Sequence, residues 1–141
     1  KGINDEVFIW KTMWESQVKL GMVPYYMFMA RNTGAINYFA VTIVNAWKIF
    51  REAYSTVSGI CRTVRGPSMS ADSGKILISG ISKINDEKVI ALTFLQGRDS
   101  LWVRKPFFAK YDENAIWLDE LKPAFTEKFF FEEGMKNFQK T

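Results

Sequence analysis

The chain has 141 residues, of which 48% are hydrophobic and 16% aromatic, so it is long enough for one domain with a real core and too apolar for general disorder. Its net charge of +4 comes from basic residues spread among acidic ones, which is unlike the basic stripe typical of nucleic-acid binding, so we expect no nucleic-acid partner. One cysteine, Cys61, and no histidine exclude an internal disulfide, a three-cysteine iron–sulfur site and any histidine-based triad or metal site within these residues.

Targeting and membrane signals are missing from the sequence as given. It contains no run of 18 apolar residues and no signal peptide, so we expect no membrane partner and, by default, a cytoplasmic location. The chain opens on "KGINDEVF" without a methionine, and we expect it to be part of a longer protein.

The first predicted element is an amphipathic helix. Apolar residues from Val7 to Val18 recur at helical spacing, Asn4 or Asp5 is positioned to cap the helix, and Gly21 is a typical helix end. The uninterrupted apolar run at 22–30 then predicts a buried strand.

A second helix–strand pair follows a polar loop at 31–34. Residues 41–57 have helical periodicity with Thr42 as the cap, and 58–64 predict a second short strand. The order helix–strand–helix–strand favours parallel strands joined by a helical crossover. Residues 65–74, rich in small side chains, are expected to form a loop.

Antiparallel strands are predicted after Lys75. Residues 75–84 read as a strand, and 88–95 with 101–108 as a hairpin across Gln96–Ser100. The segment 115–136 predicts short helices or mixed structure, with aromatic anchors at Phe125, Phe129 and Phe130.

Two loops are the candidates for a site. In α/β folds, sites gather at the carboxyl ends of parallel strands. Here one such loop carries Arg31 and the other runs from Arg65 to Lys75. If the two strands are neighbours, both loops face one opening.

Five motifs resemble the lysine 2,3-aminomutase family, which comprises radical-SAM enzymes that also use pyridoxal phosphate. They are "GINDE", "VPYYMFMAR", "NYF", "VSGICR" and "GP-S…GK", in order and in register from Gly2 to Lys75. Beyond about residue 85 the resemblance fades. It implies that residues 1–84 are the C-terminal fragment of a partial (β/α) TIM-type barrel, followed in 85–141 by an antiparallel β-hairpin and an aromatic-rich tail with short helices.

The resemblance also implies an activity for the intact protein. Family members cleave S-adenosylmethionine reductively at a 4Fe–4S cluster, and the resulting radical drives migration of an amino group from the α to the β carbon. The CxxxCxxC cluster motif would precede residue 1, so this part alone is expected to be inactive. The implied partners are its own N-terminal region, a small amino-acid substrate and further copies in a homo-oligomer.

Lys75 falls on the lysine that joins pyridoxal phosphate in the family. Such a lysine must be partly unprotonated, which burial or a neighbouring cation promotes. Small neighbours, among them Ser73 and Gly74, would let the cofactor approach the backbone. These three are the cofactor-binding residues that the resemblance implies, with Lys75 catalytic.

Two departures bear on the substrate. Lysine-acting members hold the distal ammonium with two aspartates, at positions that are Arg31 and Ser68 here. A guanidinium repels an ammonium and matches a carboxylate, so the substrate is expected not to be lysine but to carry a distal anion or a neutral polar group, and an acidic amino acid such as glutamate is one candidate. The glycine run before Lys75 is replaced by "SADSGK", which adds Asp72. Lysine-acting members often carry a structural zinc site built from cysteines, and the position of its first ligand is Glu6 here, so we expect no metal in this chain.

Two alternatives stay open from the sequence. The chain could belong to a diverged radical-SAM protein without pyridoxal phosphate or aminomutase activity, with Lys75 a polar contact and Arg31 facing solvent. It could also be a non-enzymatic interaction module with a basic, aromatic surface.

Overall fold

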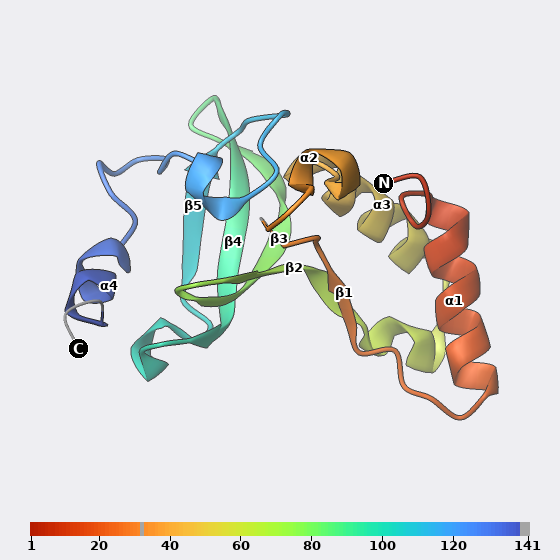
Figure 1. The fold of residues 1–141 in the computed structure, drawn as a ribbon. Coiled ribbons are helices and arrows are strands. Elements are labelled where there is room, and N and C mark those ends of the chain that lie inside the picture. Colours follow the sequence, from red (N-terminus) through yellow and green to blue (C-terminus); the bar gives the residue numbers. More distant parts are fainter. Residues whose placement is uncertain (32, 139–141) are drawn as a thin grey trace.

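A five-stranded sheet in the order β1-β2-β3-β4-β5 forms the centre of the structure, a computed structural model that describes residues 1–31 and 33–138 (Figure 1). Asn32, expected in the polar loop, lies outside the described residues. The strands are β1 (Tyr26–Phe28), β2 (Arg65–Ala71), β3 (Gly74–Ile84), β4 (Glu87–Gly97) and β5 (Pro106–Lys110). Among the strands of the described residues, β1 and β2 pair in parallel and the other neighbouring pairs are antiparallel. The predicted α/β class is therefore confirmed, whereas the sheet is open and a partial TIM-type barrel is not confirmed.

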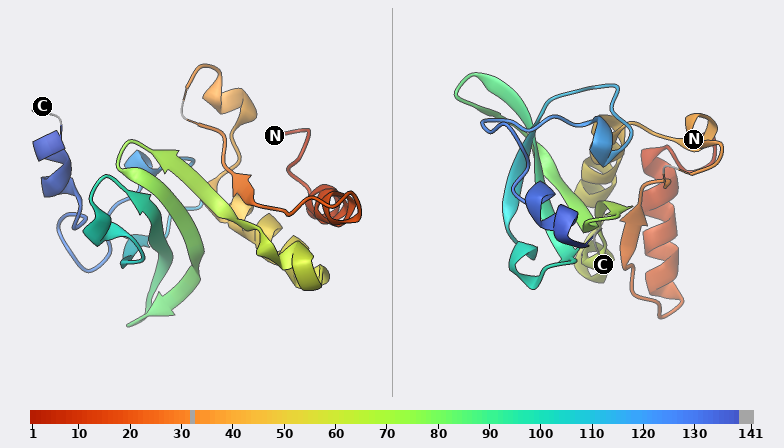
Figure 2. Two further views of the ribbon diagram at one scale, coloured as in Figure 1. Left: turned by 90° about the horizontal axis from the view of Figure 1, so that it is seen from below. Right: turned by 60° about the vertical axis from the view of Figure 1, so that its left-hand side comes forward.

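The helices lie toward both ends of this sheet. They are α1 (Val7–Lys19), α2 (Ile36–Phe39), α3 (Ile43–Thr56) and α4 (Glu132–Phe138), with 3-10 turns η1 (Gly59–Thr63), η2 (Ser100–Trp102) and η3 (Leu118–Glu120). Figure 2 shows α1 and α3 beside the β1–β2 end and α4 at the opposite end. The β1–α3–β2 connection is the helical crossover that the sequence predicted.

Helix α1 ends as the sequence predicted but begins differently. Gly21 has a φ of 78°, and its N–H and that of Met22 donate to the carbonyls of Val18 and Gln17, which closes the last turn. At the other end the cap residue is Glu6, without a side-chain cap bond. Asp5 does not cap the helix, because its Oδ1 accepts the Gly2 N–H at 2.8 Å, and this bond holds the Asp5 pKa below its ordinary value.

Helix α3 has the predicted cap. The Thr42 Oγ1 accepts the N–H of Asn45 at 3.3 Å, which satisfies one of the free amides of the first turn. Ala53 and Val57 form a small core with Trp10 and Trp14 of α1 and Met27 of β1.

One strand prediction and one loop prediction in this region were wrong. Residues 59–63, predicted as strand, form η1, in which Cys61 is buried against the α1–α3 core. The pairing partner of β1 is instead β2, formed by residues predicted as loop. Its small side chains fit because β2 is covered by neighbours on both edges, as Phe28↔Ser68 and Ser68↔Leu77 pairing shows. Strand β1 is shorter than the 22–30 run, and Met22 and Val23 are exposed.

The second half of the chain builds the larger core. Strands β4 and β5 pair antiparallel as predicted, but residues 98–105 connect them, including η2 with buried Trp102. The inner faces of β3, β4 and β5 are covered by residues 115–131. Among the expected aromatic anchors Phe129 is buried, whereas Phe125 is half exposed and Phe131 takes its place in the core.

Candidate functional site

Lys75 lies within strand β3 and not at the end of a loop. Asp72 and Ser73 form a tight turn between β2 and β3, and Ser70 pairs with Lys75 across the two strands. Because side chains alternate along a strand, Ile76 is fully buried in the core and Lys75 points to the opposite face. The chain therefore uses β3 to hold the amine on the side of the sheet away from the large core.

The Lys75 amine is placed by aromatic residues of β1. Its Nζ lies 4.6 Å from the ring centroid of Tyr26 and 5.4 Å from that of Phe28. The two rings are themselves stacked, with centroids 4.7 Å apart. Ammonium groups are attracted to ring faces at this range, so the side chain has a defined position although it is only half-buried.

Arg31 and Lys75 open onto the same hollow. This surface depression, the Lys75 hollow, has a volume of about 330 Å³, and its charged lining residues are Arg31, Asp72, Lys75 and Arg98. Arg31 follows β1 and Asp72 follows β2, so the hollow forms where the carboxyl ends of two parallel strands meet. Arg31 and Lys75 therefore line one opening as expected, although residues 65–71 form a strand and not a loop.

Ser73 faces a different hollow. It is 4% exposed and lines a second space of about 330 Å³, the Ser73 hollow, which also reaches Arg31 and is walled by Trp117, Phe129 and Phe131. Its Oγ has no hydrogen-bond partner among the described residues. A buried hydroxyl without a partner is costly, so this group is available to a ligand.

Gly74 is required by strand packing. It has a φ of 143°, and a Cβ at this position would overlap the carbonyl oxygen of Gln96 on β4. The residue lines the Lys75 hollow, yet the close approach of β3 to β4 explains the glycine without a cofactor.

Ser68 is separate from the other predicted substrate contact. It is fully buried, and its hydroxyl donates to the carbonyl oxygen of Met27 at 3.4 Å. It lines neither the Lys75 hollow nor the Ser73 hollow, whereas Arg31 is exposed at the rim of both. Of the two residues predicted to contact a distal anion, the structure places only Arg31 beside Lys75.

The donor set of the Lys75 hollow fits pyridoxal phosphate. The amine of Lys75 provides the attachment point, and guanidiniums such as Arg31 and Arg98 match a phosphate. The carboxylate of Asp72 is the type of group that pairs with a pyridinium nitrogen. Arg98 is held in place because its Nε donates to the Asp72 carbonyl oxygen at 2.6 Å.

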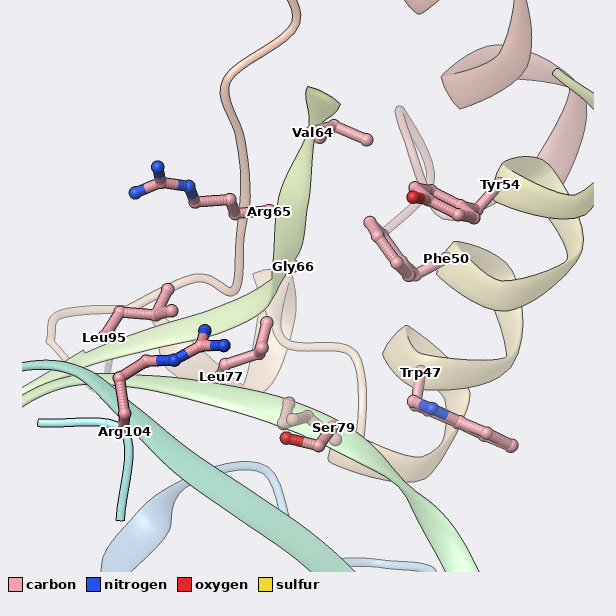
Figure 3. Close-up of a pocket in the computed structure, with 11 residues that line it drawn as sticks. Trp47, Phe50, Tyr54, Val64, Arg65, Gly66, Leu77, Ser79, Leu95 and Arg104 are labelled. Atoms are coloured by element: carbon pink, nitrogen blue, oxygen red, sulfur yellow. The ribbon is translucent and has the colours of Figure 1, made fainter. Parts of the chain in front are cut away.

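A larger hollow, which was not predicted from the sequence, lies between α3 and the sheet. It has a volume of about 460 Å³, and Figure 3 shows Arg65 and Arg104 on one side of Gly66, with Phe50 and Tyr54 on the other. Arg104 was assigned to a strand from the sequence, and no local motif marks it. The single signal in the sequence was Arg65 at the start of the 65–75 segment.

No cluster of three or more histidine, cysteine, aspartate or glutamate residues suited to a metal occurs in residues 1–31 and 33–138. Within the same ranges no helix has both the length and the apolar character needed to cross a bilayer.

Comparison with known proteins relates part of the chain to one curated protein. Over 80 residues it is 35% identical to "Putative L-lysine 2,3-aminomutase" of Aquifex aeolicus, a match that covers 57% of this chain and 21% of that protein. The chain thus spans about a fifth of the length of the curated relative it matches. No protein-family model matches the sequence, and no solved structure matches it. The relation expected from the five motifs is supported over part of the chain.

Proposed function

We propose that this chain is the C-terminal part of a radical-SAM, pyridoxal-phosphate-dependent aminomutase whose substrate is an acidic amino acid and not lysine. The observation that carries the proposal is that Lys75 and Arg31, at positions fixed by the resemblance, line one hollow. The match to the Aquifex aeolicus protein supports the aminomutase relation.

Pyridoxal phosphate, when bound, would supply an electron-delocalising ring to which the substrate amine is linked. Lys75 lines the hollow, and its amine is limited in position by the rings of Tyr26 and Phe28. Arg98, whose Nε donates to the Asp72 carbonyl, would pair with the phosphate of the cofactor. The Asp72 carboxylate would accept a hydrogen bond from the protonated ring nitrogen.

Arg31 is assigned to the substrate. As an exposed guanidinium at the rim, it would pair with a side-chain carboxylate in two parallel hydrogen bonds and would repel the ammonium of lysine. Ser68 takes no part in this contact, because its hydroxyl is buried and bound to the Met27 carbonyl. The 4Fe–4S cluster and S-adenosylmethionine would be bound by residues of the longer protein outside this chain.

The test uses the full-length protein that contains this chain, reconstituted with pyridoxal phosphate and the 4Fe–4S cluster and assayed with S-adenosylmethionine and a one-electron reductant. We expect an absorbance band of lysine-linked cofactor that Lys75→Ala removes and that Lys83→Ala, a change of an exposed lysine on the same strand, retains. With the wild-type protein, glutamate and not lysine should be converted to its β-amino isomer, and Arg31→Ala should lower that conversion. A protein that takes up no pyridoxal phosphate, or a Lys75→Ala variant with an unchanged band, contradicts the proposal.

One observation favours a second candidate, a radical-SAM protein without pyridoxal phosphate. The Lys75 amine already has two aromatic partners in β1, so its position has an explanation that needs no cofactor. On this reading the full-length protein binds S-adenosylmethionine, takes up no pyridoxal phosphate, and loses stability but no cofactor band in Lys75→Ala.

A further inference from the structure

We propose that the hollow between α3 and strands β2, β3 and β4 is a binding site for a small anion that carries an aromatic or other apolar body. This Arg65–Arg104 hollow is distinct from the Lys75 and Ser73 hollows and does not depend on the function proposed above. At about 460 Å³ it falls within the size range of small-molecule sites.

The charge of the hollow selects an anion. Two guanidiniums, Arg65 and Arg104, line it, and no acidic side chain is among its lining residues. In the described part of the chain, the ion pairs are Lys11–Glu15 and Lys83–Asp86, so neither arginine is neutralised by a carboxylate. Both arginine side chains are exposed, and two like charges at one hollow favour a bound anion, because it relieves their repulsion and accepts charge-assisted hydrogen bonds.

The two arginines are held in place by the surrounding structure. The Arg65 guanidinium carbon lies 5.3 Å from the Tyr25 ring centroid and 5.9 Å from that of Tyr26, so aromatic faces limit its motion. Arg104 has a φ of 66°, which residues other than glycine seldom adopt, and its N–H donates to the Phe94 carbonyl at 2.8 Å. A non-glycine residue kept in this conformation is a feature that clusters at ligand sites.

The remaining walls select an apolar body. Phe50 and Tyr54 project from α3 on one side of Gly66, and Leu77 and Leu95 lie on the arginine side (Figure 3). The Phe50 and Tyr54 rings are stacked with centroids 5.3 Å apart. An aryl or alkyl group against these side chains would leave its anionic end toward the guanidiniums.

Calorimetric titration of the full-length protein that contains this chain tests this proposal with three probes. Phenyl phosphate carries both features, inorganic phosphate has the anion alone, and phenol has the ring alone. We expect phenyl phosphate to bind at least about tenfold more tightly than either of the others, since only it uses both halves of the hollow. Benzoate in place of phenyl phosphate distinguishes a carboxylate site from a phosphate site, and binding of either anion with an aryl group supports the proposal.

Variants locate the binding. Arg104→Gly removes the guanidinium and suits the positive φ, so the fold should be retained while phenyl phosphate binds about tenfold or more weakly. Lys48→Ala, which removes an exposed cation on α3 outside the hollow, should change the affinity less than about twofold. If Arg104→Gly melts below the wild type, Arg65→Ala serves as the second variant with the same expected loss. Equal binding of phenol and phenyl phosphate, unchanged binding by these variants, or no binding of any probe would overturn the proposal.

Discussion

Replacing Gly74 by alanine tests whether this glycine is needed by the packing of β3 on β4. The backbone at Gly74 has a φ of 143°, and the added Cβ would overlap the Gln96 carbonyl oxygen. A side chain in such a conformation costs about 1–3 kcal/mol, and the displaced strand contacts add to this, so we expect the free energy of unfolding to fall by about 3 kcal/mol. With a urea dependence of about 2 kcal/mol per M, the unfolding midpoint would fall by about 1.5 M.

The matched control is Gly80→Ala on the same strand. Its Cβ would meet nothing nearer than the Trp47 Nε1 at 3.8 Å, and its φ is not positive, so we expect a change within about 1 kcal/mol. Both variants are measured by urea unfolding followed by far-ultraviolet circular dichroism. Equal losses for the two variants, or wild-type stability in Gly74→Ala, would refute the reasoning and would leave the glycine free for another role.

Two further pairs of substitutions test the interior. Ser73→Ala removes a buried hydroxyl that has no partner among the described residues, so the free energy of unfolding should stay level or rise by about 1 kcal/mol. Ser68→Ala breaks the hydrogen bond to the Met27 carbonyl and should lower the free energy of unfolding by about 1 kcal/mol. A Ser73→Ala variant that melts below Ser68→Ala would contradict this prediction. Phe94→Ala leaves a cavity at a fully buried position and should lower the free energy of unfolding by about 3–5 kcal/mol. Its control, Phe8→Ala, changes a side chain that is 71% exposed and should lower the free energy of unfolding by less than about 0.5 kcal/mol. Similar losses for the two variants in denaturant titrations would contradict the burial of Phe94.

The candidate site was predicted from the sequence in part. Arg31 and the segment up to Lys75 were expected at one opening because both follow neighbouring parallel strands, and the hollow that they share agrees with this. The positions of Ser68 and Ser73 could not be predicted. Both positions depend on which residues form β2, and the small side chains of residues 65–74 predict a loop there and not a strand.

Arg104 illustrates the same limit. Its sequence context, "LWVRKPFF", has the apolar character of a strand, and a strand was predicted. In the structure the chain turns at η2 because Trp102 is buried against Phe94, and Arg104 is left beside Leu77 and Leu95 in the Arg65–Arg104 hollow. Burial of one tryptophan in the core thus decided where the arginine lies.

The sequence alone determined the features that depend on near neighbours in the chain. The periodicity of α1 and α3, the Thr42 cap, the Gly21 helix end and the strand β3 were all correct, because each depends on contacts within a few residues. The tertiary structure decided the strand partners, the openness of the sheet and which charges share a hollow. These depend on pairing between distant segments, since a β2 flanked on both edges buries small residues that would otherwise form a loop.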